Sequence, residues 1–533
     1  MKFFRVSRIF CVALAFLLFT LPVLAELRLP ALFSDGMVVQ RDMSIPVWGW
    51  ATPGEEVEVE VDGQVVRGHA DKEGRWNVRL PAQSATAIPQ SIIVTASDET
   101  RVINNVLVGE VWVCSGQSNM RWPLHRIYDP DLEAAVARFP AIRYISVPTL
   151  GTQELQEDFE GSWVAASPST VGNFSAVAFL FGRWLHEITD VPVGLIHNSW
   201  GGSSAEAWVR RDVLEADGRF ADYLDKWRET EATFDAEAEQ RKWEEAMEAW
   251  RVKSARLKAE GKAEPPRPRA PGNPLGNQHR PGNLYAGMLN PLIGYGIRGV
   301  IWYQGESNAG RAWHYRALFP LMIEHWRAEW GQGDFPFYWV QLANFKAEQP
   351  DPGESDWAEL REAQTLALQL PHTGQAVIYD LGEARDIHPR DKQNVARRLA
   401  RIALARDYDM NVVHRSPTFR DMEIRGNKLI VRFSDTGDGL YSFDVVNPLG
   451  FAVAGADRQW HWAEASITEP DTVEVSSVHV PEPVAVRYAW ADNPVATLRN
   501  LEGLPVVPFR SDDWPITTQP KETEDSPVRP TGE

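Results

Sequence analysis

Residues 111–120 read Val-Trp-Val-Cys-Ser-Gly-Gln-Ser-Asn-Met, an apolar run that ends abruptly in small and polar residues. Further apolar runs follow along the chain, and helical periodicity follows most of them. The strands predicted in this way are 111–114, 193–197, 299–303, 337–342 and 376–380. Apolar strands that alternate with helices predict a parallel sheet covered by helices, which is an α/β fold.

The segments on either side of the predicted sheet have a different pattern of apolar and polar residues. Short alternating runs there predict β-rich domains, and the first of these is a small β-sandwich with a hairpin signal at Asp62-Gly63. A charged helical insertion and an irregular loop interrupt the α/β region at about 213–282. The chain therefore divides into a β-sandwich domain, an α/β domain, a C-terminal β-rich region and a disordered tail, at 26–105, 106–411, 412–516 and 517–533.

The first 25 residues have the pattern of an export signal. A basic start is followed by an apolar run at 9–19 and by the small-residue end Val23-Leu24-Ala25. That run is shorter than a membrane-spanning helix, so residues 1–25 are predicted to be a cleaved signal peptide. The protein is then expected in the periplasm or outside the cell, with no membrane association. A retained membrane anchor is the alternative.

The composition excludes several classes of partner. The formal net charge of -19 disfavours nucleic acids and anionic membrane surfaces. The sequence has no His-Glu-x-x-His, Walker A or clustered Cys/His pattern, so no metal and no cofactor is predicted. The oligomeric state has no signal in the sequence.

The polar residues at the predicted strand ends suggest acyl transfer. Ser118 lies where the carboxyl edge of an open α/β sheet forms a ligand crevice, although Ser115 and Ser199 also lie near strand ends. A serine nucleophile needs a base and a group that orients the base. His388 follows the last predicted strand, and Asp386 projects to the same side of an extended segment. A neighbouring carboxylate is expected to raise the pKa of His388.

Two more strand ends offer donors for an oxyanion. Gly201 and Gly202 precede a predicted helix start, where backbone amides favour negative charge. Gln304 and Asn308 offer side-chain amides after the third predicted strand. Paired carboxylates for glycoside cleavage, Glu306 with Asp386, remain an alternative at this point.

Four blocks of the sequence together resemble the sialate O-acetylesterase family, a branch of the SGNH hydrolases. The likeness covers about residues 30–406, and the blocks are Gly-Gln-Ser-Asn-Met, Trp-Gly-Gly, Trp-Tyr-Gln-Gly-Glu-Ser-Asn and Asp-Ile-His-Pro, at 116–120, 200–202, 302–308 and 386–389. The resemblance implies a flavodoxin-like three-layer SGNH core with the flanking β-sandwich-type domains.

The resemblance also implies residue roles. Ser118 is the nucleophile and His388 the base, and the oxyanion hole uses the Ser118 amide, the glycine pair and one side-chain amide, with Gln304 favoured over Asn308. SGNH enzymes usually show Asp-x-x-His, whereas this chain has Asp-x-His. Asp386 as the third member, Asp380 in its place, or a Ser-His dyad with a backbone carbonyl therefore all stay open.

The expected substrate is an O-acetylated sugar or glycan. Sialate esters are the first expectation, and acetylated plant polysaccharides such as xylan or xyloglucan are the alternative. Gln117 and Glu306 are candidate substrate-binding residues, and Arg361 and Arg311 are candidates to meet the sialate carboxylate. A non-catalytic glycan-binding protein on the same fold is the rival class.

Overall fold

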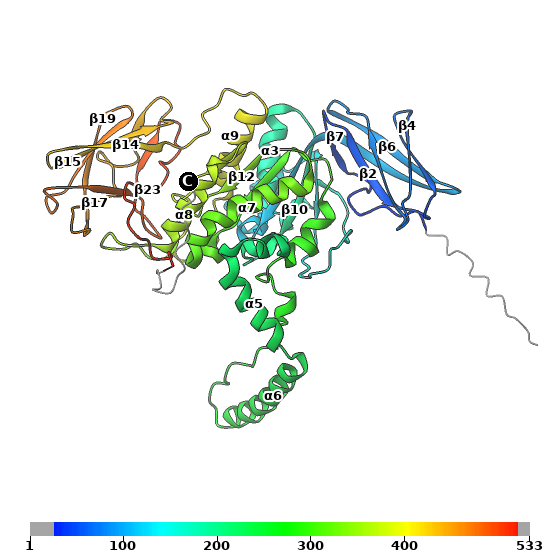
Figure 1. Cartoon of the computed structure of the whole chain (residues 1–533), viewed down its shortest axis with the longest axis horizontal. Helices are drawn as coiled ribbons and strands as arrows, with labels where there is room; N and C mark the ends of the chain where they lie inside the picture. The colour runs from blue at the N-terminus through cyan, green and yellow to red at the C-terminus, as the bar shows by residue number, and fades with distance from the viewer. Residues whose placement is uncertain (1–25, 521–533) are drawn as a thin grey trace, which may run out of the picture.

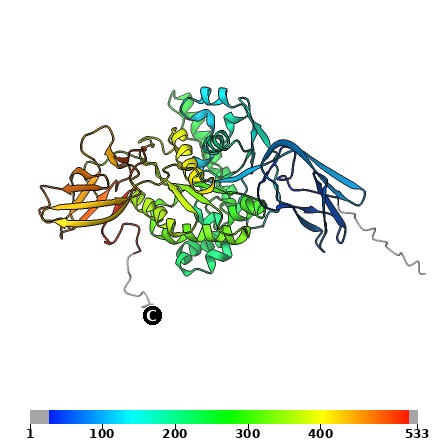
Figure 2. The same cartoon turned by 90° about the horizontal axis from the view of Figure 1, so that it is seen from above.

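The computed structural model describes residues 26–520, so the predicted signal peptide and residues 521–533 lie outside the described part. The chain forms an elongated molecule with an α/β domain in the middle and one β-rich domain at each end (Figures 1 and 2). The expected fold class is confirmed, since a parallel sheet is covered on both faces by helices and is flanked by β-rich domains.

The central sheet places the carboxyl end of β7 at its topological switch point. The chain runs from β7 to one side of the sheet and then returns to build the other side. In spatial order the strands are β13 (Thr373–Ala376), β12 (Phe337–Val340), β11 (Gly299–Tyr303), β7 (Glu99–Gly116), β10 (Val193–Ser199), β8 (Phe139–Ser146) and the antiparallel β9 (Val164–Ala166). Open α/β sheets bind ligands at such a point, because the loops on either side diverge there.

Two of these strands differ from the sequence prediction. β8 has no predicted counterpart, because Pro140 and Arg143 interrupt its apolar pattern. β13 begins and ends earlier than the predicted strand 376–380. The residues after it, Val377 to Tyr379, are buried but continue beyond the point where β12 ends at Val340, so they have no strand to pair with there.

The helices form the outer two layers. α3 (Ala176–Thr189) and α9 (Lys392–Asp407) pack together on one face, and α7 (Ala312–Trp330) and α8 (Asp356–Leu366) on the other. Adjacent residues of β11 show the division, since Trp302 belongs to the core on the α7 side and Tyr303 to the core on the α9 side. Strands buried on both faces read as continuous apolar runs, which is why these strands were visible in the sequence.

The N-terminal β domain shares one strand with the α/β domain. The first half of β7 pairs with β1 and β6, and its second half pairs with β10 and β11. The boundary expected near residue 105 therefore falls inside a continuous strand. The strands of this domain are β1 (Val38–Gln40), β2 (Ile45–Trp50), β3 (Glu56–Val61), β4 (Gln64–His69), β5 (Arg75–Leu80) and β6 (Thr86–Ala96).

The charged insertion forms α4 (Arg211–Glu215), α5 (Ala221–Thr233) and α6 (Ala236–Ala259), and α5 and α6 project away from the α/β domain (Figure 1). Two shorter helices, α1 (Ser118–Arg121) and α2 (Pro130–Val136), follow β7. The C-terminal domain contains β14 (Thr418–Arg425), β15 (Lys428–Ser434), β16 (Leu440–Ser442), β17 (Phe451–Ala454), β18 (Trp460–Trp462), β19 (Glu464–Glu469), β20 (Thr472–Ser476), β21 (Ala485–Tyr488), β22 (Leu498–Asn500) and β23 (Phe509–Arg510).

The start of the predicted disordered tail is attached to the α/β domain. The backbone amides of Thr517 and Thr518 donate to the two carboxylate oxygens of Glu359, at 2.7 and 2.9 Å. Glu359 is fully buried, and a buried carboxylate needs donors. The expectation of disorder from residue 517 is therefore wrong for these two residues.

Candidate active site

Ser118 lies directly after the central strand of the sheet. β7 ends at Gly116, whose φ is +135°, and a Cβ atom there would lie 2.2 Å from the carbonyl oxygen of Tyr303. Only glycine allows the two strand ends to approach so closely. Ser118 then begins α1 and remains half-buried, with its hydroxyl directed to His388.

His388 joins Ser118 and Asp386 in one hydrogen-bonded chain. Its Nε2 lies 2.8 Å from the Ser118 hydroxyl, and its Nδ1 lies 3.1 Å from Asp386 Oδ1. Asp386 Oδ1 also accepts from the backbone amide of His388 at 2.9 Å. The short Asp-x-His segment is therefore folded so that one carboxylate oxygen contacts both the backbone and the ring of His388. The structure thus brings these three predicted residues together. Asp380 is occupied elsewhere, because its carboxylate pairs with Arg398 and Arg499.

The imidazole of His388 is half-buried, and this determines its acidity. Burial lowers the pKa of His388 below its ordinary value of 6.5, and this exceeds the opposing effect of Asp386, which raises the pKa. The expectation of a raised pKa is therefore wrong, because desolvation of the imidazolium outweighs one half-exposed carboxylate.

The glycine pair lies against the serine. A Cβ atom on Gly201 would lie 3.4 Å from the Cβ of Ser118, so this backbone lies beside the Ser118 side chain and a side chain here would touch it. Gly202 has φ of +73°, and its carbonyl accepts from the Ser307 hydroxyl at 2.8 Å. Within residues 26–520 the backbone amide of Gly201 has no protein acceptor, which leaves it available to a ligand.

The two predicted side-chain amides are engaged with the segment after the glycine pair. Gln304 is fully buried and donates both amide hydrogens, one to the carbonyl of Ser203 and one to Asn308 Oδ1. Asn308 is also buried, accepts from the amide of Ala205 and donates to Glu206. These contacts correct the expectation that Gln304 is an oxyanion donor, because both of its amide hydrogens hold the loop. Asn308 gives one of its two amide hydrogens to Glu206, and its role in the oxyanion hole stays a prediction.

Gln117 is a buried link between strand ends. Its Oε1 accepts from the amide of Gly305 at 3.4 Å, and its backbone amide donates to Tyr303. Oε1 of Gln117 therefore supports the fold, whereas its Nε2 has no hydrogen-bond partner within residues 26–520, and the substrate-binding role of Gln117 stays a prediction.

Glu306 also has an internal partner. Its Oε1 accepts from the Asn119 amide at 2.5 Å, and burial raises the pKa of Glu306. The predicted substrate-binding role of Glu306 is corrected on this ground. The glycosidase alternative fails as well, because Asp386 is bound to His388 and Glu306 to Asn119.

Arg361 lies inside the protein. Its guanidinium is fully buried and donates to four backbone carbonyls, of Leu342, Ala343, Ala491 and Asp492. Sequence reasoning placed Arg361 in the crevice, and the structure corrects this, since an arginine that satisfies carbonyls at a domain junction has no free face for a substrate.

Two residues of the site were not found from the sequence. Trp122 stacks on His388 with ring centroids 4.4 Å apart, and Lys392 donates to Asn119 Oδ1 at 2.6 Å. Trp122 lies only four residues after Ser118, so its place next to the conspicuous motif was a usable signal. In the sequence Lys392 is indistinguishable from an exposed lysine of a helix, and nothing there marks it as buried.

His197 is the other histidine near the strand ends, and it is engaged with a different serine. Its Nε2 lies 2.6 Å from the Ser199 hydroxyl, and both residues are buried. Burial lowers the pKa of His197 to about 3. His197 therefore stays neutral and supports the end of β10 from within.

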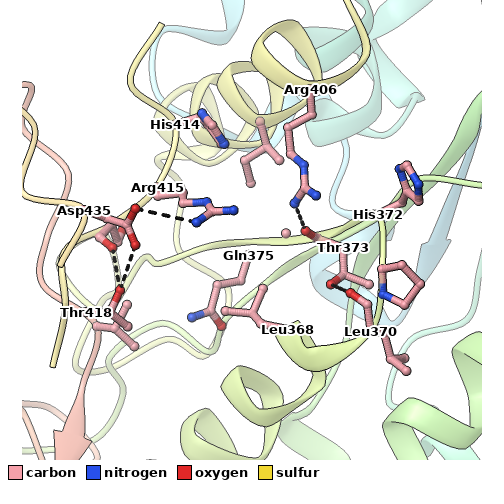
Figure 3. Close-up of a pocket in the computed structure, with 15 residues that line it drawn as sticks. Leu368, Leu370, His372, Thr373, Gln375, Arg406, His414, Arg415, Thr418 and Asp435 are labelled. Carbon is pink, nitrogen blue, oxygen red and sulfur yellow. Dashed lines mark hydrogen bonds and ion pairs between the residues drawn. The ribbon is translucent and has the colours of Figure 1, made fainter. Parts of the chain in front are cut away.

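The cavity in Figure 3 is remote from this chemistry. It is lined by residues at the start of β13, in α9 and in the C-terminal domain, among them His372, Thr373, Arg406, His414 and Asp435. Ser118 lies at the carboxyl ends of the strands, whereas Thr373 begins β13 at the opposite edge of the sheet. This cavity is therefore not the crevice of the Ser118–His388 pair.

Two further findings concern residues 26–520 alone. No group of three or more His, Cys, Asp or Glu residues in this range could hold a metal ion. No helix in the same range is long and apolar enough to cross a membrane.

The chain is similar to known esterases over most of its length. Residues 272–404 match a family described as carbohydrate esterase, sialic acid-specific acetylesterase. The chain is 29% identical to the sialate O-acetylesterase of Mus musculus over 90% of this chain and 94% of that protein, and 28% identical to that of Homo sapiens, over 88% of each.

A solved structure extends this likeness to the whole fold. The crystal structure of a carbohydrate acetylesterase from Xanthomonas citri is 37% identical, with a TM-score of 0.78, and the match covers 92% of this chain and all of that one. With this likeness and the sialate O-acetylesterase relatives, the chain is a carboxylic ester hydrolase and belongs to the carbohydrate acetylesterase family that includes the sialate O-acetylesterases.

Proposed function

We propose that the protein removes O-acetyl groups from sugars through an acetyl-enzyme on Ser118, and that sialate O-acetyl esters are its substrate class. The observation that carries the proposal is the 2.8 Å contact between the Ser118 hydroxyl and His388 Nε2, continued from Nδ1 to Asp386. A hydroxyl, a base and an orienting carboxylate in this order are what nucleophilic acyl transfer needs.

In the first half of the reaction, Ser118 Oγ attacks the acetyl carbonyl carbon while His388 Nε2 takes the hydroxyl proton. The carbonyl oxygen becomes an oxyanion, and the backbone amides of Ser118 and Gly201 are the donors we assign to it. His388 then gives its proton to the departing sugar oxygen as the C–O bond breaks. The products of this half are the free sugar hydroxyl and the acetyl-enzyme.

In the second half, water attacks the acetyl carbonyl while His388 takes its proton. The new tetrahedral intermediate collapses, and His388 returns the proton to Ser118 Oγ. Acetic acid leaves, and the serine hydroxyl is restored. Asp386 keeps Nδ1–H directed toward itself throughout, which leaves the Nε2 lone pair for the serine.

The sialate proposal rests on the relatives and on one exposed arginine. The mouse and human proteins at 28–29% identity are named sialate O-acetylesterases. Arg126 is exposed, its guanidinium carbon lies 5.4 Å from the Trp122 ring centre, and its charge helps lower the pKa of His388. It is thus better placed for a carboxylate than Arg361, or than Arg311, which pairs with Glu206.

An acetylated neutral polysaccharide is the second candidate. The burial of Arg361 favours it, because the arginine that the sequence offered for the sialate carboxylate is unavailable. The Xanthomonas citri protein at 37% identity is named only as a carbohydrate acetylesterase. The non-catalytic alternative is disfavoured by the serine–histidine contact, since sugar binding alone gives no reason for it.

The deciding experiment compares kcat/KM on O-acetyl sialic acid, acetylated xylan and acetylated xyloglucan, with 4-nitrophenyl acetate as a common reference. Arg126→Ala should raise KM for the sialate ester more than KM for neutral esters. A preference for a neutral polysaccharide, or an equal effect of Arg126→Ala on all substrates, would reject sialate as the substrate class. No turnover of any ester would reject the esterase proposal.

We also propose that the enzyme acts outside the cytoplasm. Support comes from the basic start, the short apolar run and the Val-Leu-Ala end of residues 1–25. N-terminal sequencing of the protein from cell fractions checks this, with Glu26 expected as the first residue of exported material. An intact N-terminus in the cytoplasmic fraction would contradict it.

A further inference from the structure

Lys392 occupies a position that is unfavourable for a cation. It is fully buried and is the first residue of α9, where the helix dipole disfavours positive charge. Its Nζ lies 5.0 Å from the Tyr303 ring centre and donates to Asn119 Oδ1 at 2.6 Å. Within residues 26–520 no carboxylate lies at ion-pair distance from this amine. Burial lowers the pKa of Lys392 to about 7.

Asn119 connects this lysine to both partners of the proton transfer. The residue directly follows Ser118, and its Nδ2 donates to the backbone carbonyl of Ile387 at 3.0 Å. Ile387 directly precedes His388. The second Nδ2 hydrogen goes to Glu306 Oε1 at 2.5 Å. One side-chain amide therefore joins the segment of the nucleophile to the segment of the base.

The identity of Lys392 fixes which way this amide points. The amine of Lys392 can donate to Asn119 Oδ1 whether it is charged or neutral, and as an ammonium group it can only donate, so it favours the oxygen of Asn119 on its side. A flipped amide would turn its nitrogen toward the lysine and its oxygen toward the Ile387 carbonyl, where two acceptors would face each other. With the oxygen held, Nδ2 must point at Ile387. An apolar residue at position 392 would leave Asn119 Oδ1 buried without its donor, so only the two acceptors on the Nδ2 side, Ile387 and Glu306, would still hold the amide.

We propose that Lys392 is a positioning residue: by holding Asn119 Oδ1 it directs the Asn119 amide to the Ile387 carbonyl and thereby keeps His388 at proton-transfer distance from Ser118. This inference rests on the proposed Ser118–His388 mechanism. The lysine touches neither the substrate nor the reacting atoms. Loss of Lys392 is expected to lower kcat and to leave KM nearly unchanged, because proton transfer depends on the Oγ–Nε2 separation and sugar binding does not.

The test compares two substitutions at position 392. Lys392→Met has a similar length and no donor, whereas Lys392→Gln keeps an N–H donor for Asn119. With 4-nitrophenyl acetate, Lys392→Met should lower kcat by at least about 10-fold, with KM within about 3-fold, since a misplacement of about 1 Å can cost up to about a hundredfold. Lys392→Gln should recover part of that loss.

Asn119→Asp keeps the proposal testable if Lys392→Met does not fold. An aspartate still accepts from Lys392, and its second oxygen can accept from Glu306 in the protonated form, which burial already favours by raising the pKa of Glu306. It has no hydrogen to give to Ile387. The variant should fold and still lose kcat by at least about 10-fold. A wild-type kcat in folded Asn119→Asp or Lys392→Met would overturn the proposal.

Arg327→Met is the matched control for losing a buried cation. Arg327 is buried in α7 and donates to the carbonyls of Phe335 and Pro371 near the start of β12, at the edge of the sheet opposite Ser118. Its substitution should lower Tm and leave kcat unchanged below the transition. If its kcat falls as far as that of Lys392→Met, the effect is general destabilisation and the proposal is wrong.

Labelling with a fluorophosphonate distinguishes a failure of the positioning role of Lys392 from a failure of the Ser118–His388 mechanism. The second-order rate of labelling of Ser118 should fall in Lys392→Met in parallel with kcat. If wild-type Ser118 is not labelled, the proposed mechanism itself fails. If wild-type and Lys392→Met are labelled at the same rate, the mechanism stands and the positioning role is excluded.

Discussion

Trp122 lies flat against the imidazole of His388, with ring centroids 4.4 Å apart and ring planes inclined by 10°. The indole Nε1 donates to the carbonyl of Arg126 at 3.2 Å, which fixes the ring in its plane. Stacking leaves both imidazole nitrogens free at the edge, so Nε2 can face Ser118 while Nδ1 faces Asp386. The tryptophan therefore acts as a wall that limits rotation of the base.

Trp122→Ala is expected to lower kcat/KM on a small acetyl ester on the order of tenfold, because the imidazole loses the surface that orients it. Trp122→Phe keeps a flat ring and should retain most of the rate. Steady-state kinetics on both variants provide the check. Equal losses in the two would show that the indole N–H matters and that the stacked face does not.

The rate should depend on one ionisation below pH 6.5 on the acid side. His388 must be neutral to accept the Ser118 proton, and burial lowers the pKa of His388 below its ordinary value of 6.5. Activity is therefore present above the folded pKa and is lost as the pH falls through it. A pH profile of kcat/KM measures this directly, and an acid limb centred above pH 6.5 would contradict the assignment.

Asp386→Asn should move that acid limb further toward acid. The Asp386 carboxylate raises the pKa of His388, so its loss leaves the desolvation that lowers the pKa unopposed. The plateau rate should also fall, on the order of a hundredfold or more, because an asparagine does not stabilise the imidazolium and its Nδ2 can face Nδ1 and favour the wrong tautomer. An unchanged plateau would mean that a Ser-His dyad suffices.

Gly116→Ala is expected to cost about 3 kcal/mol or more of unfolding free energy, because the new methyl group would lie 2.2 Å from the Tyr303 carbonyl at a φ of +135°. Gly172→Ala is the control, since a Cβ there meets nothing within 4 Å and its φ needs no glycine. Urea titrations of both variants check the difference. A Gly116→Ala protein as stable as Gly172→Ala would contradict the described contact of β7 with β11.

Strands buried on both faces were predictable because their apolar runs are continuous. β7, β10 and β11 are of this kind, and the polar blocks that follow them identified Ser118 and Gly201. β8 was not predictable, because Arg143 lies within it, buried and bonded to the carbonyl of Gly36. An arginine whose charge is solvated by backbone carbonyls looks like a surface residue in a sequence.

The same limit explains the errors at the site. Arg361 and Gln304 were assigned to the crevice by their chemistry, and both turned out to satisfy backbone groups inside the fold. Lys392 was missed for the opposite reason, since a sequence does not show which lysine of a helix faces inward. Residue type indicates which chemistry is available, but which groups already have partners is a property of the tertiary structure.

The central claim is that Ser118 is the nucleophile, and its covalent modification tests this most directly. Wild-type protein is treated with a fluorophosphonate, digested and mapped by mass spectrometry, beside Ser118→Ala. The account predicts a label on Ser118 in wild type, none in the variant, and a loss of esterase activity on the order of a thousandfold or more in Ser118→Ala with Tm unchanged. A label on another serine, or a Ser118→Ala enzyme within about tenfold of wild type, would contradict it.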